Sequence, residues 1–209
     1  MKYEWRKKDK KLYLPNENPA IVEVPEQKFI MIKGKGNPND KEFSDAIGVL
    51  YSLAYAIKTM PKKGIEPEGY FDYTVFPLEA LWDKTEESKC SSTLIKEELI
   101  YTIMIRQPDF VTQDLLSKAI EIVKKKKPHN MIENVEFGII NDGLCVQMLH
   151  KGSYDNEPES FNIMNEFCKE NKFIRKSDIH REIYITNESK VSNVDLLKTV
   201  LRFEVKKEM

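Results

Sequence analysis

The sequence of 209 residues has few cysteines and no long apolar run. Its three cysteines, Cys90, Cys145 and Cys168, include no CxxC pair, which argues against a disulfide framework or a zinc site and favours a reducing cytoplasm. No apolar run approaches the ~20 residues needed to span a bilayer. The N-terminal stretch MKYEWRKKDKK also lacks the apolar segment of a secretory signal. We therefore expect a cytoplasmic protein without a membrane partner.

Recognisable catalytic signatures are missing as well. There is no GxSxG, no Walker loop and no HExxH motif, and GKGNP does not match a dinucleotide fingerprint. The three histidines lie on separate predicted elements without metal-ligand spacing; they are His129, His150 and His180. The sequence therefore predicts no cofactor and no metal site.

Charge of one sign is not in excess. Lys and Arg number 33 and Asp and Glu number 34, so the formal net charge is −1 and no global basic field attracts nucleic acid. Lysine clusters at 7–11 and 124–127 flank or end predicted elements, which favours a solvated surface over a nucleic-acid contact. A composition of 41% hydrophobic and 32% charged residues indicates a soluble globular protein, and the length suits a single domain over 1–209.

What the sequence does contain is a repeat. FIMIKGKGNPNDKEF, residues 29–43, and QMLHKGSYDNEPESF, residues 147–161, superpose at an offset of 118 with their Lys-Gly pairs and their final phenylalanines in register. Each copy is typical of a strand, a glycine-containing turn, a polar loop and a helix. This shared order of elements predicts an internal duplication.

Two further strands are predicted after each helix, so each half is expected to run strand-helix-strand-strand. The halves span about 20–110 and 131–209, and residues 111–130 are expected to form a linker helix. We expect a strand over residues 69–82, with Phe71, Tyr73 and Val75 alternating, and a β-hairpin at the Asp142-Gly143 turn. The predicted fold is therefore α+β, with a mainly antiparallel sheet and a ligand cleft where the pseudo-twofold halves meet.

Residues 177–187, SDIHREIYITN, are predicted to form a strand with a carboxylate at its middle. One face carries His180, Glu182 and Tyr184, because strand side chains alternate. The opposite face is apolar and comprises Ile179, Ile183 and Ile185. Two interpretations remain open for Glu182. Its face is either simply wet, or it lines a pocket in which desolvation raises the pKa of Glu182 and lets it act as a base or bind a cation.

Aromatic residues lie on several elements of the first half. Tyr51 and Tyr55 are at helical spacing on a helix that is expected to be buried nearly all round. Trp82 ends a predicted strand, and Tyr70 and Tyr101 lie on the strands expected to pair with each other. These residues are either ordinary core or the walls of a slot that clamps a flat organic molecule between ring faces.

Five segments together resemble the GyrI-like small-molecule-binding family, in order over nearly the whole chain. They are KKLYLPNENPAIVEVPEQKFIMIKGKGNPN, FPLEALW, YTIMIRQPDFVT, LHKGSYDNEPESF and HREIYITNESK. They are most similar to the stand-alone branch that includes the cyclopropanoid cyclopropyl hydrolases. The resemblance implies a SOUL/GyrI-like fold of duplicated strand-helix-strand-strand units around a ligand cleft.

The resemblance also implies roles for particular residues. Glu182 matches the glutamate at the floor of the family's cleft, Trp82 matches the tryptophan of an LEGLW-like motif, and Tyr101 matches an aromatic position. Tyr55 and Tyr70 are assigned to the aromatic cage. The chain departs from the family pattern at two positions, since Arg181 replaces a frequent second histidine and Asp83 replaces a frequent second tryptophan.

The function implied by the resemblance is hydrolysis of the cyclopropane ring in flat DNA-alkylating compounds, that is, xenobiotic detoxification. Glu182 is then expected to orient and deprotonate the attacking water, and Tyr55 or Tyr70 to donate to the developing phenolate. Tyr51, Tyr184 and His180 are expected to line the ligand site.

A different function would use the same residues. The alternative is a non-catalytic multidrug-binding protein that sequesters cationic, aromatic compounds with cation–π help from the cage. Some relatives bind DNA gyrase, but nothing specific in this sequence supports such a partner. No helix-turn-helix module precedes the domain, so the transcription-factor role of fused relatives is not expected.

Overall fold

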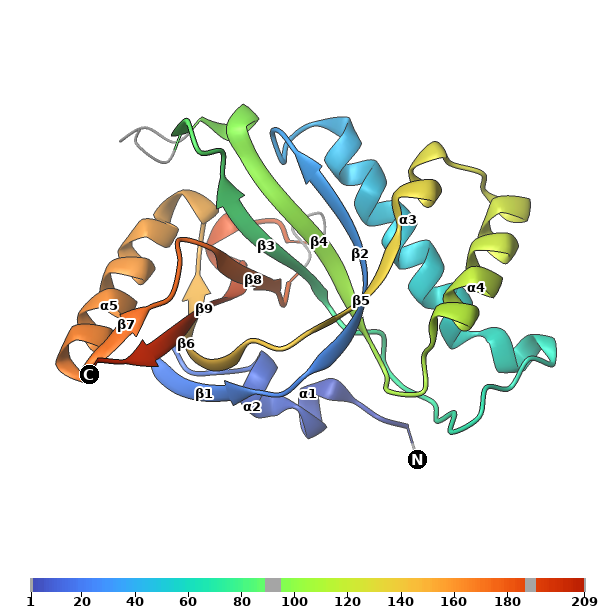
Figure 1. Ribbon diagram of the computed structural model, residues 1–209, viewed down its shortest axis with the longest axis horizontal. Helices are drawn as coiled ribbons and strands as arrows, with labels where there is room; N and C mark the ends of the chain where they lie inside the picture. The colour runs from blue at the N-terminus through green and yellow to red at the C-terminus, as the bar shows by residue number, and fades with distance from the viewer. Residues whose placement is uncertain (1, 89–94, 187–190, 209) are drawn as a thin grey trace. The chain divides into compact units, whose positions relative to one another are not determined.

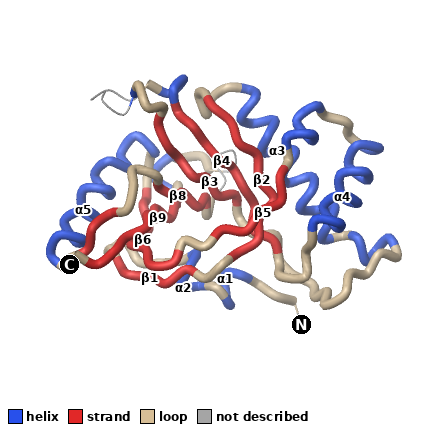
Figure 2. The backbone as a smooth tube through the Cα atoms, in the orientation of Figure 1, coloured by secondary structure: helices blue, strands red, loops and turns tan. Residues whose placement is uncertain are grey.

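The computed structural model describes residues 2–88, 95–186 and 191–208 (Figure 1). The chain forms two compact units, one made of Met1–Glu4 and Gln27–Ile140 and the other of Trp5–Glu26 and Asn141–Met209. We call them unit 1 and unit 2. Each combines helices with antiparallel strands (Figure 2), which confirms the predicted α+β class.

The sheet of unit 1 is antiparallel throughout. Its strands follow the spatial order β3 (Leu78–Lys84), β4 (Leu99–Gln107), β2 (Gln27–Lys35) and β5 (Glu136–Ile140). The central strand β2 is apolar enough to be buried on both faces, so it forms the middle of the core.

Two helices cover this sheet. The first, α3 (Lys41–Lys58), packs against β2 and β4, and α4 (Gln113–Lys126) lies alongside α3 (Figure 1). Thr112 caps α4 by accepting a hydrogen bond from the backbone N–H of Leu115, and the predicted linker helix is confirmed. The described residues of unit 1 also include the short 3-10 turns η1 (Met60–Lys63), η3 (Lys96–Glu98) and η4 (Asn130–Asn134).

The sheet of unit 2 has the spatial order β1 (Ala20–Val24), β6 (Gly143–Lys151), β9 (Lys198–Lys207) and β8 (His180–Tyr184), also antiparallel. A short strand, β7 (Phe173–Arg175), pairs with the far end of β9. Strand β9 also carries a buried charged residue. Arg202 is buried, and its guanidinium donates to Gln147 Oε1 and to the backbone oxygen of Leu12.

One longer helix covers part of this sheet. Helix α5 (Glu157–Glu170) packs on β6 and β7, and a cluster of Val146, Met148, Met164, Leu201 and Phe203 fills the space beneath it. The other helical elements in the described part of unit 2 are short; they are α1 (Trp5–Lys8), α2 (Lys10–Tyr13), η5 (Tyr154–Asn156) and η7 (Val194–Leu196).

The two sheets confirm the duplication, but at a different offset from the predicted one. The order β3-β4-β2-β5 in unit 1 corresponds to β8-β9-β6-β1 in unit 2. Element starts at residues 20, 27 and 41 recur at 136, 143 and 157, an offset of 116 rather than 118. This offset pairs Gly36 with Gly152, whose φ angles of 125° and 112° both require the conformational freedom of glycine.

Each repeat contributes its first strand to the sheet of the other. Strand β1 precedes β2 in the chain but pairs with β6, and β5 precedes β6 but pairs with β2. The expected halves of about 20–110 and 131–209 therefore resemble the two units except for these exchanged strands. That the whole chain is one domain stays a prediction.

The hairpin predicted at Asp142-Gly143 is wrong, because β5 and β6 lie in different units and do not pair. The turn chemistry itself is as expected, since Gly143 has φ 61°. Asp142 has a structural role there: its buried carboxylate lies 2.8 Å from the guanidinium of Arg181.

The strand predicted over 69–82 is confirmed only in its last part, which belongs to β3, whereas residues 70–77 form no regular strand. Tyr73 makes one isolated parallel bridge with Tyr3, and the strand of this region, β3, begins at Leu78 directly after Pro77. Proline has no N–H to donate to a strand ladder, so regular pairing starts only beyond it.

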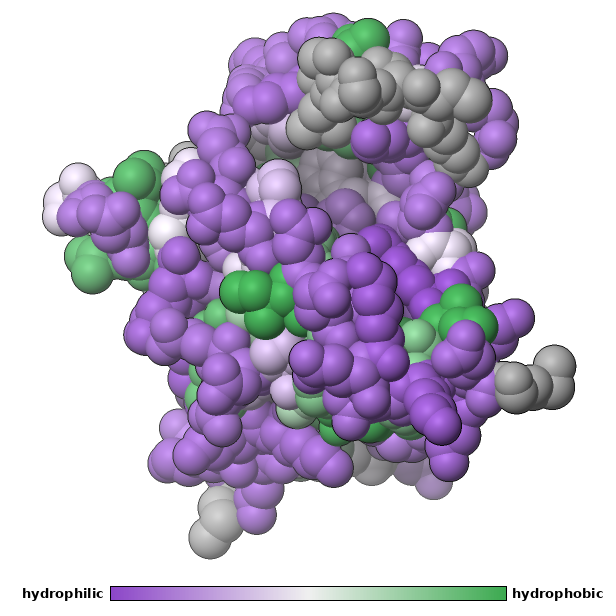
Figure 3. Space-filling model, turned by 90° about the vertical axis from the view of Figure 1, so that its left-hand side faces the viewer, coloured by the Kyte–Doolittle hydropathy of each residue, from purple (hydrophilic) through white to green (hydrophobic). Residues whose placement is uncertain are grey.

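Burial of α3 is less complete than predicted. Leu50, Leu53 and Ile57 are fully buried, but Tyr55 is 54% exposed and Gly48 is exposed as well. The helix is therefore amphipathic, with Tyr55 on its solvent side. Figure 3 shows a face of the molecule where hydrophilic residues predominate and hydrophobic residues form separate patches.

Candidate functional site

Strand β8 carries Glu182 into a buried position. Glu182 is only 8% exposed, and its flanking residues Arg181 and Ile183 are buried on the opposite face of the strand. The ion pair with Asp142 holds Arg181 on that face. Because side chains on a strand alternate, Glu182 must then face the other side. Ile179 departs from the prediction because it lies before β8 and is 41% exposed.

Two neighbours on the same face as Glu182 donate to its carboxylate. The hydroxyl of Tyr184 donates to Oε2 at 2.7 Å, and Nε2 of His180 lies 3.2 Å from Oε1. The ring of Tyr184 meets that of Tyr154 edge-on at 6.0 Å, and the ring of His180 meets that of Phe161 at 4.8 Å. The prediction that His180, Glu182 and Tyr184 share one face is therefore confirmed, and the face is not simply wet.

A second carboxyl group at this place was missed by the sequence analysis. Glu157, the first residue of α5, is 7% exposed and hydrogen-bonds the side chain of Glu182. The sequence analysis placed this residue in the polar loop before the second helix, whereas α5 already begins at Glu157. The overlooked signal is Pro158 in the first turn, a position where proline is favoured because the missing N–H has no intrahelical partner.

Glu157 holds a proton at neutral pH. Burial raises the pKa of its carboxyl to about 10, and the negative charge of Glu182, the hydrogen bond to Glu182 and the charge of Asp155 act in the same direction. The neutral acid of Glu157 therefore donates to the carboxylate of Glu182. Among the described residues, Oε1 of Glu157 is buried and has no hydrogen-bond partner.

In unit 1, Trp82 and Tyr101 belong to a packed aromatic cluster. Their rings lie 5.7 Å apart, and Phe43 contacts both, at 5.7 Å from Trp82 and 4.9 Å from Tyr101. Both predicted site residues are buried, and burial raises the pKa of the Tyr101 hydroxyl. Tyr101 lies directly over Gly34, the residue paired with it on β2.

Gly34→Ala is expected to destabilise the protein by about 1–3 kcal/mol, because the added Cβ would lie 2.4 Å from the Tyr101 ring, which Phe43 and Trp82 hold in place. Urea unfolding measures this change. Gly48→Ala is the matched control, because among the described residues nothing beyond its own helix backbone and chain neighbours lies within 4 Å of the added Cβ, and alanine favours a helix by about 0.5–1 kcal/mol. Equal stability of Gly34→Ala and the wild type would contradict the described packing.

The three remaining predicted aromatics of unit 1 differ in accessibility. The rings of Tyr51 and Tyr55 lie 6.4 Å apart on α3, and burial raises the pKa of Tyr51 whereas Tyr55 is exposed. The hydroxyl of Tyr70 donates to the backbone oxygen of Lys58 at 3.4 Å, and its ring packs edge-on against Phe110. The candidate residues thus divide between the units, with His180, Glu182 and Tyr184 in unit 2 and the other five in unit 1. A cleft where the halves meet stays a prediction.

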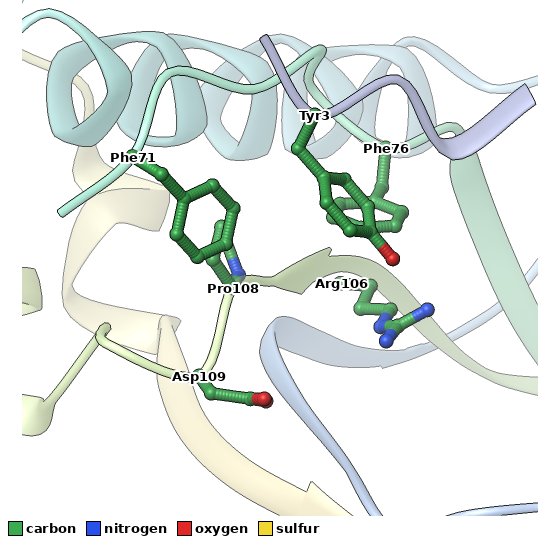
Figure 4. Close-up of a pocket in the computed structure, with 6 residues that line it drawn as sticks. All are labelled: Tyr3, Phe71, Phe76, Arg106, Pro108 and Asp109. Carbon is green, nitrogen blue, oxygen red and sulfur yellow. The ribbon is translucent and has the colours of Figure 1, made fainter. Parts of the chain in front are cut away.

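Unit 1 also has a small pocket of about 60 Å³ (Figure 4). The pocket is lined by aromatic rings, a proline and one charged side chain of each sign; these residues are Tyr3, Phe71, Phe76, Arg106, Pro108 and Asp109. The guanidinium of Arg106 lies 4.7 Å from the centre of the Phe76 ring. No residue predicted for the functional site lines this pocket, so its size and aromatic walls do not make it the candidate site.

Metal binding and cysteine chemistry find little support in the described residues. Within residues 2–88, 95–186 and 191–208, no group of three or more His, Cys, Asp or Glu side chains is placed to hold a metal ion. Burial raises the pKa of the Cys145 thiol to about 12, and Cys168 is also a buried free thiol, whereas Cys90 lies outside the described residues. None of the described helices combines the length and hydropathy that a membrane crossing requires.

The comparison with protein-family models shows which family this chain belongs to. The model of the GyrI-like small molecule binding domain matches residues 17–206. The chain belongs to the GyrI-like family. The matched residues cover most of both units and every residue that was predicted for the functional site.

Solved structures agree with this assignment. A hydrolase from Listeria innocua is 32% identical, with a TM-score of 0.88 over 98% of this chain and 100% of that one. A second hydrolase from Listeria innocua is 33% identical, with a TM-score of 0.90 over 99% and 100% of the two chains. The EcmrR C-terminal domain, 14% identical with a TM-score of 0.56 over 91% and 98%, is similar in fold alone. The comparison with curated proteins found no match.

Proposed function

We propose that this GyrI-like domain binds flat aromatic small molecules and hydrolyses those that carry a cyclopropane conjugated to a dienone. The similar Listeria innocua structures, both called hydrolases, support a hydrolytic reaction. The observation that carries the proposal is the buried carboxylate of Glu182, which is held by Tyr184, His180 and Glu157. Such a group in a buried polar cluster is typical of a site that performs chemistry.

The proposed reaction adds one water molecule to the ring. The water oxygen bonds to the least hindered cyclopropane carbon, the adjacent carbon–carbon bond breaks, and its electron pair moves through the dienone to give a phenolate. The proton of the water goes to Glu182, which returns it to solvent, and the phenolate oxygen takes up one proton from solvent, so the net change is the addition of one water. Formation of the aromatic ring drives the reaction, so the protein must mainly position the reactants.

Glu182 is suited to orient the attacking water. A carboxylate has about four acceptor directions. Tyr184, His180 and Glu157 occupy three of them among the described residues, which leaves one for a water O–H. Because the three donors fix the carboxylate, the bound water has a defined direction toward the ligand.

Several aromatic residues predicted to contact the ligand belong to unit 1, and their part in binding stays a prediction. These residues are Tyr51, Tyr70, Trp82 and Tyr101. Tyr55 is the better candidate to donate to the phenolate, because its ring is exposed whereas the hydroxyl of Tyr70 already donates to Lys58. We also propose a cytoplasmic location, which suits the buried free thiols of Cys145 and Cys168.

The experiment that tests the function is incubation of the purified protein with a cyclopropane-dienone compound, followed by mass spectrometry. The expected product has the mass of the compound plus one water, formed faster than in buffer alone. Recovery of only intact compound after long incubation would contradict hydrolysis.

Sequestration of cationic aromatic compounds is the second candidate, because Glu182 is a buried negative charge. It predicts tight binding of cationic dyes that weakens with salt, and recovery of the dye unchanged. No observation favours binding to gyrase, and a pull-down that returns no gyrase would exclude that partner.

Tyr184→Phe is expected to lower the hydrolysis rate by about 10–100-fold, because it removes a hydrogen bond to a charged group, which contributes about 1.5–3 kcal/mol. The measurement is the single-turnover rate at saturating substrate, with thermal unfolding as the check that the variant is folded. A folded Tyr184→Phe protein with the wild-type rate would show that this hydroxyl does not support Glu182 in the reaction.

A further inference from the structure

The neutral acid beside Glu182 has an acceptor atom that no described residue uses. Glu157 is 7% exposed, and its Oε1 is buried without a hydrogen-bond partner among the residues that the structure describes. Buried polar atoms are paired in the great majority of cases, and leaving one unpaired is unfavourable. This atom therefore points to a donor that is not part of the described residues.

The protonation of Glu157 determines which kind of donor fits. Its proton is directed toward Glu182, so Oε1 is a neutral carbonyl-type oxygen rather than part of a second charge. The groups that face this carboxyl are Glu182 on β8 and Asp155 in η5, with His180 and Tyr184 bound to Glu182. A neutral acceptor next to a carboxylate suits a neutral N–H or O–H group.

We propose that Oε1 of Glu157 accepts a hydrogen bond from the bound molecule, so that the site selects flat ligands with an N–H or O–H group at the edge of the ring system. This inference rests on the proposed function for the place of the ligand beside Glu182. It adds a specificity residue and narrows the ligand class to planar molecules that are apolar on their faces and carry a donor at one edge.

The test compares carbazole with N-methylcarbazole, two flat neutral probes that differ at one N–H and contain no cyclopropane. Fluorescence titration of the whole protein is expected to show carbazole binding at least on the order of tenfold more tightly, because only carbazole pairs the buried acceptor. Glu157→Met, which removes the acceptor but keeps an apolar side chain of similar length, is expected to bind both probes equally. Glu157→Gln retains a carbonyl oxygen and an N–H for Glu182, so it is the matched control and is expected to keep the preference.

Equal affinity of the wild-type protein for the two probes would overturn the inference, and so would a preference that persists in Glu157→Met. The wild-type comparison does not depend on whether a variant folds. Hydrolysis is measured separately from the product mass, so loss of the carbazole preference with intact turnover contradicts this inference alone. A retained preference without turnover contradicts the proposed reaction alone.

Discussion

Glu182→Gln is expected to lower the rate of cyclopropane hydrolysis by about 10²–10⁴-fold, the usual contribution of a general base. Glutamine has nearly the same shape, and its carbonyl oxygen still accepts one hydrogen bond, but it cannot take the proton of the attacking water. Binding of the intact compound should change much less than the rate. Product formation measured by mass spectrometry under single-turnover conditions gives the rate directly.

The matched control for this substitution is Glu159→Gln. Glu159 lies on the exposed side of α5, two residues from Glu157. Its substitution by glutamine removes one negative charge, as Glu182→Gln does. Its rate should equal that of the wild type. If Glu182→Gln also hydrolyses the compound at the wild-type rate, Glu182 does not act as the base, whatever its position.

Glu157→Gln is expected to remove a large pH dependence of the free energy of unfolding. The pKa of Glu157 is raised from 4.5 to about 10 in the folded protein, first by burial and then by Glu182. Between these two values the folded state holds a proton that the unfolded state has released. Stability is therefore highest below the unfolded pKa and is lost as pH rises, until the folded pKa is reached.

The expected size of the effect follows from this difference in bound protons. Each pH unit lowers the free energy of unfolding by about 1 kcal/mol at most, so the loss between pH 6 and 9 is on the order of a few kcal/mol. Glutamine does not titrate, so Glu157→Gln should lack this slope whatever its absolute stability. Urea unfolding at several pH values measures the slope for both proteins, with Glu159→Gln as the control that keeps it. Parallel slopes for the wild type and Glu157→Gln would show that Glu157 is ionised in the folded state.

Local patterns predicted several elements well. Helix α4 lies within residues 111–130, where a helix was predicted, and the alternation of β8 places His180, Glu182 and Tyr184 together. These features depend on residues close in sequence, where turn chemistry and periodicity determine the structure. The family resemblance added the overall fold, which the match over residues 17–206 confirms.

The errors arose where the outcome depends on distant residues. The turn at Asp142-Gly143 has the expected glycine conformation, but no local signal tells that β5 pairs with β2 and β6 with β1. A matching Lys-Gly pair gave an offset of 118, whereas the φ angles of Gly36 and Gly152 identify 116. Strand exchange between repeats keeps each repeat intact in sequence, so composition alone does not reveal it.

The candidate site could be predicted only in part for the same reason. Glu182 was identified from its strand, but Glu157 lies on a different element and meets it only in the folded chain. The roles of Trp82 and Tyr101 depend on packing, and both are buried in a cluster with Phe43. Their part in ligand binding remains a proposal.

The most direct test of the central claim is a crystal structure of Glu182→Gln with an intact cyclopropane-dienone compound. The reactive cyclopropane carbon is expected to lie one water molecule away from residue 182, with Glu157 at the edge of the ligand. A compound bound instead among Tyr3, Phe71 and Arg106, with residue 182 far from the cyclopropane, would contradict the assignment of Glu182 to the reaction.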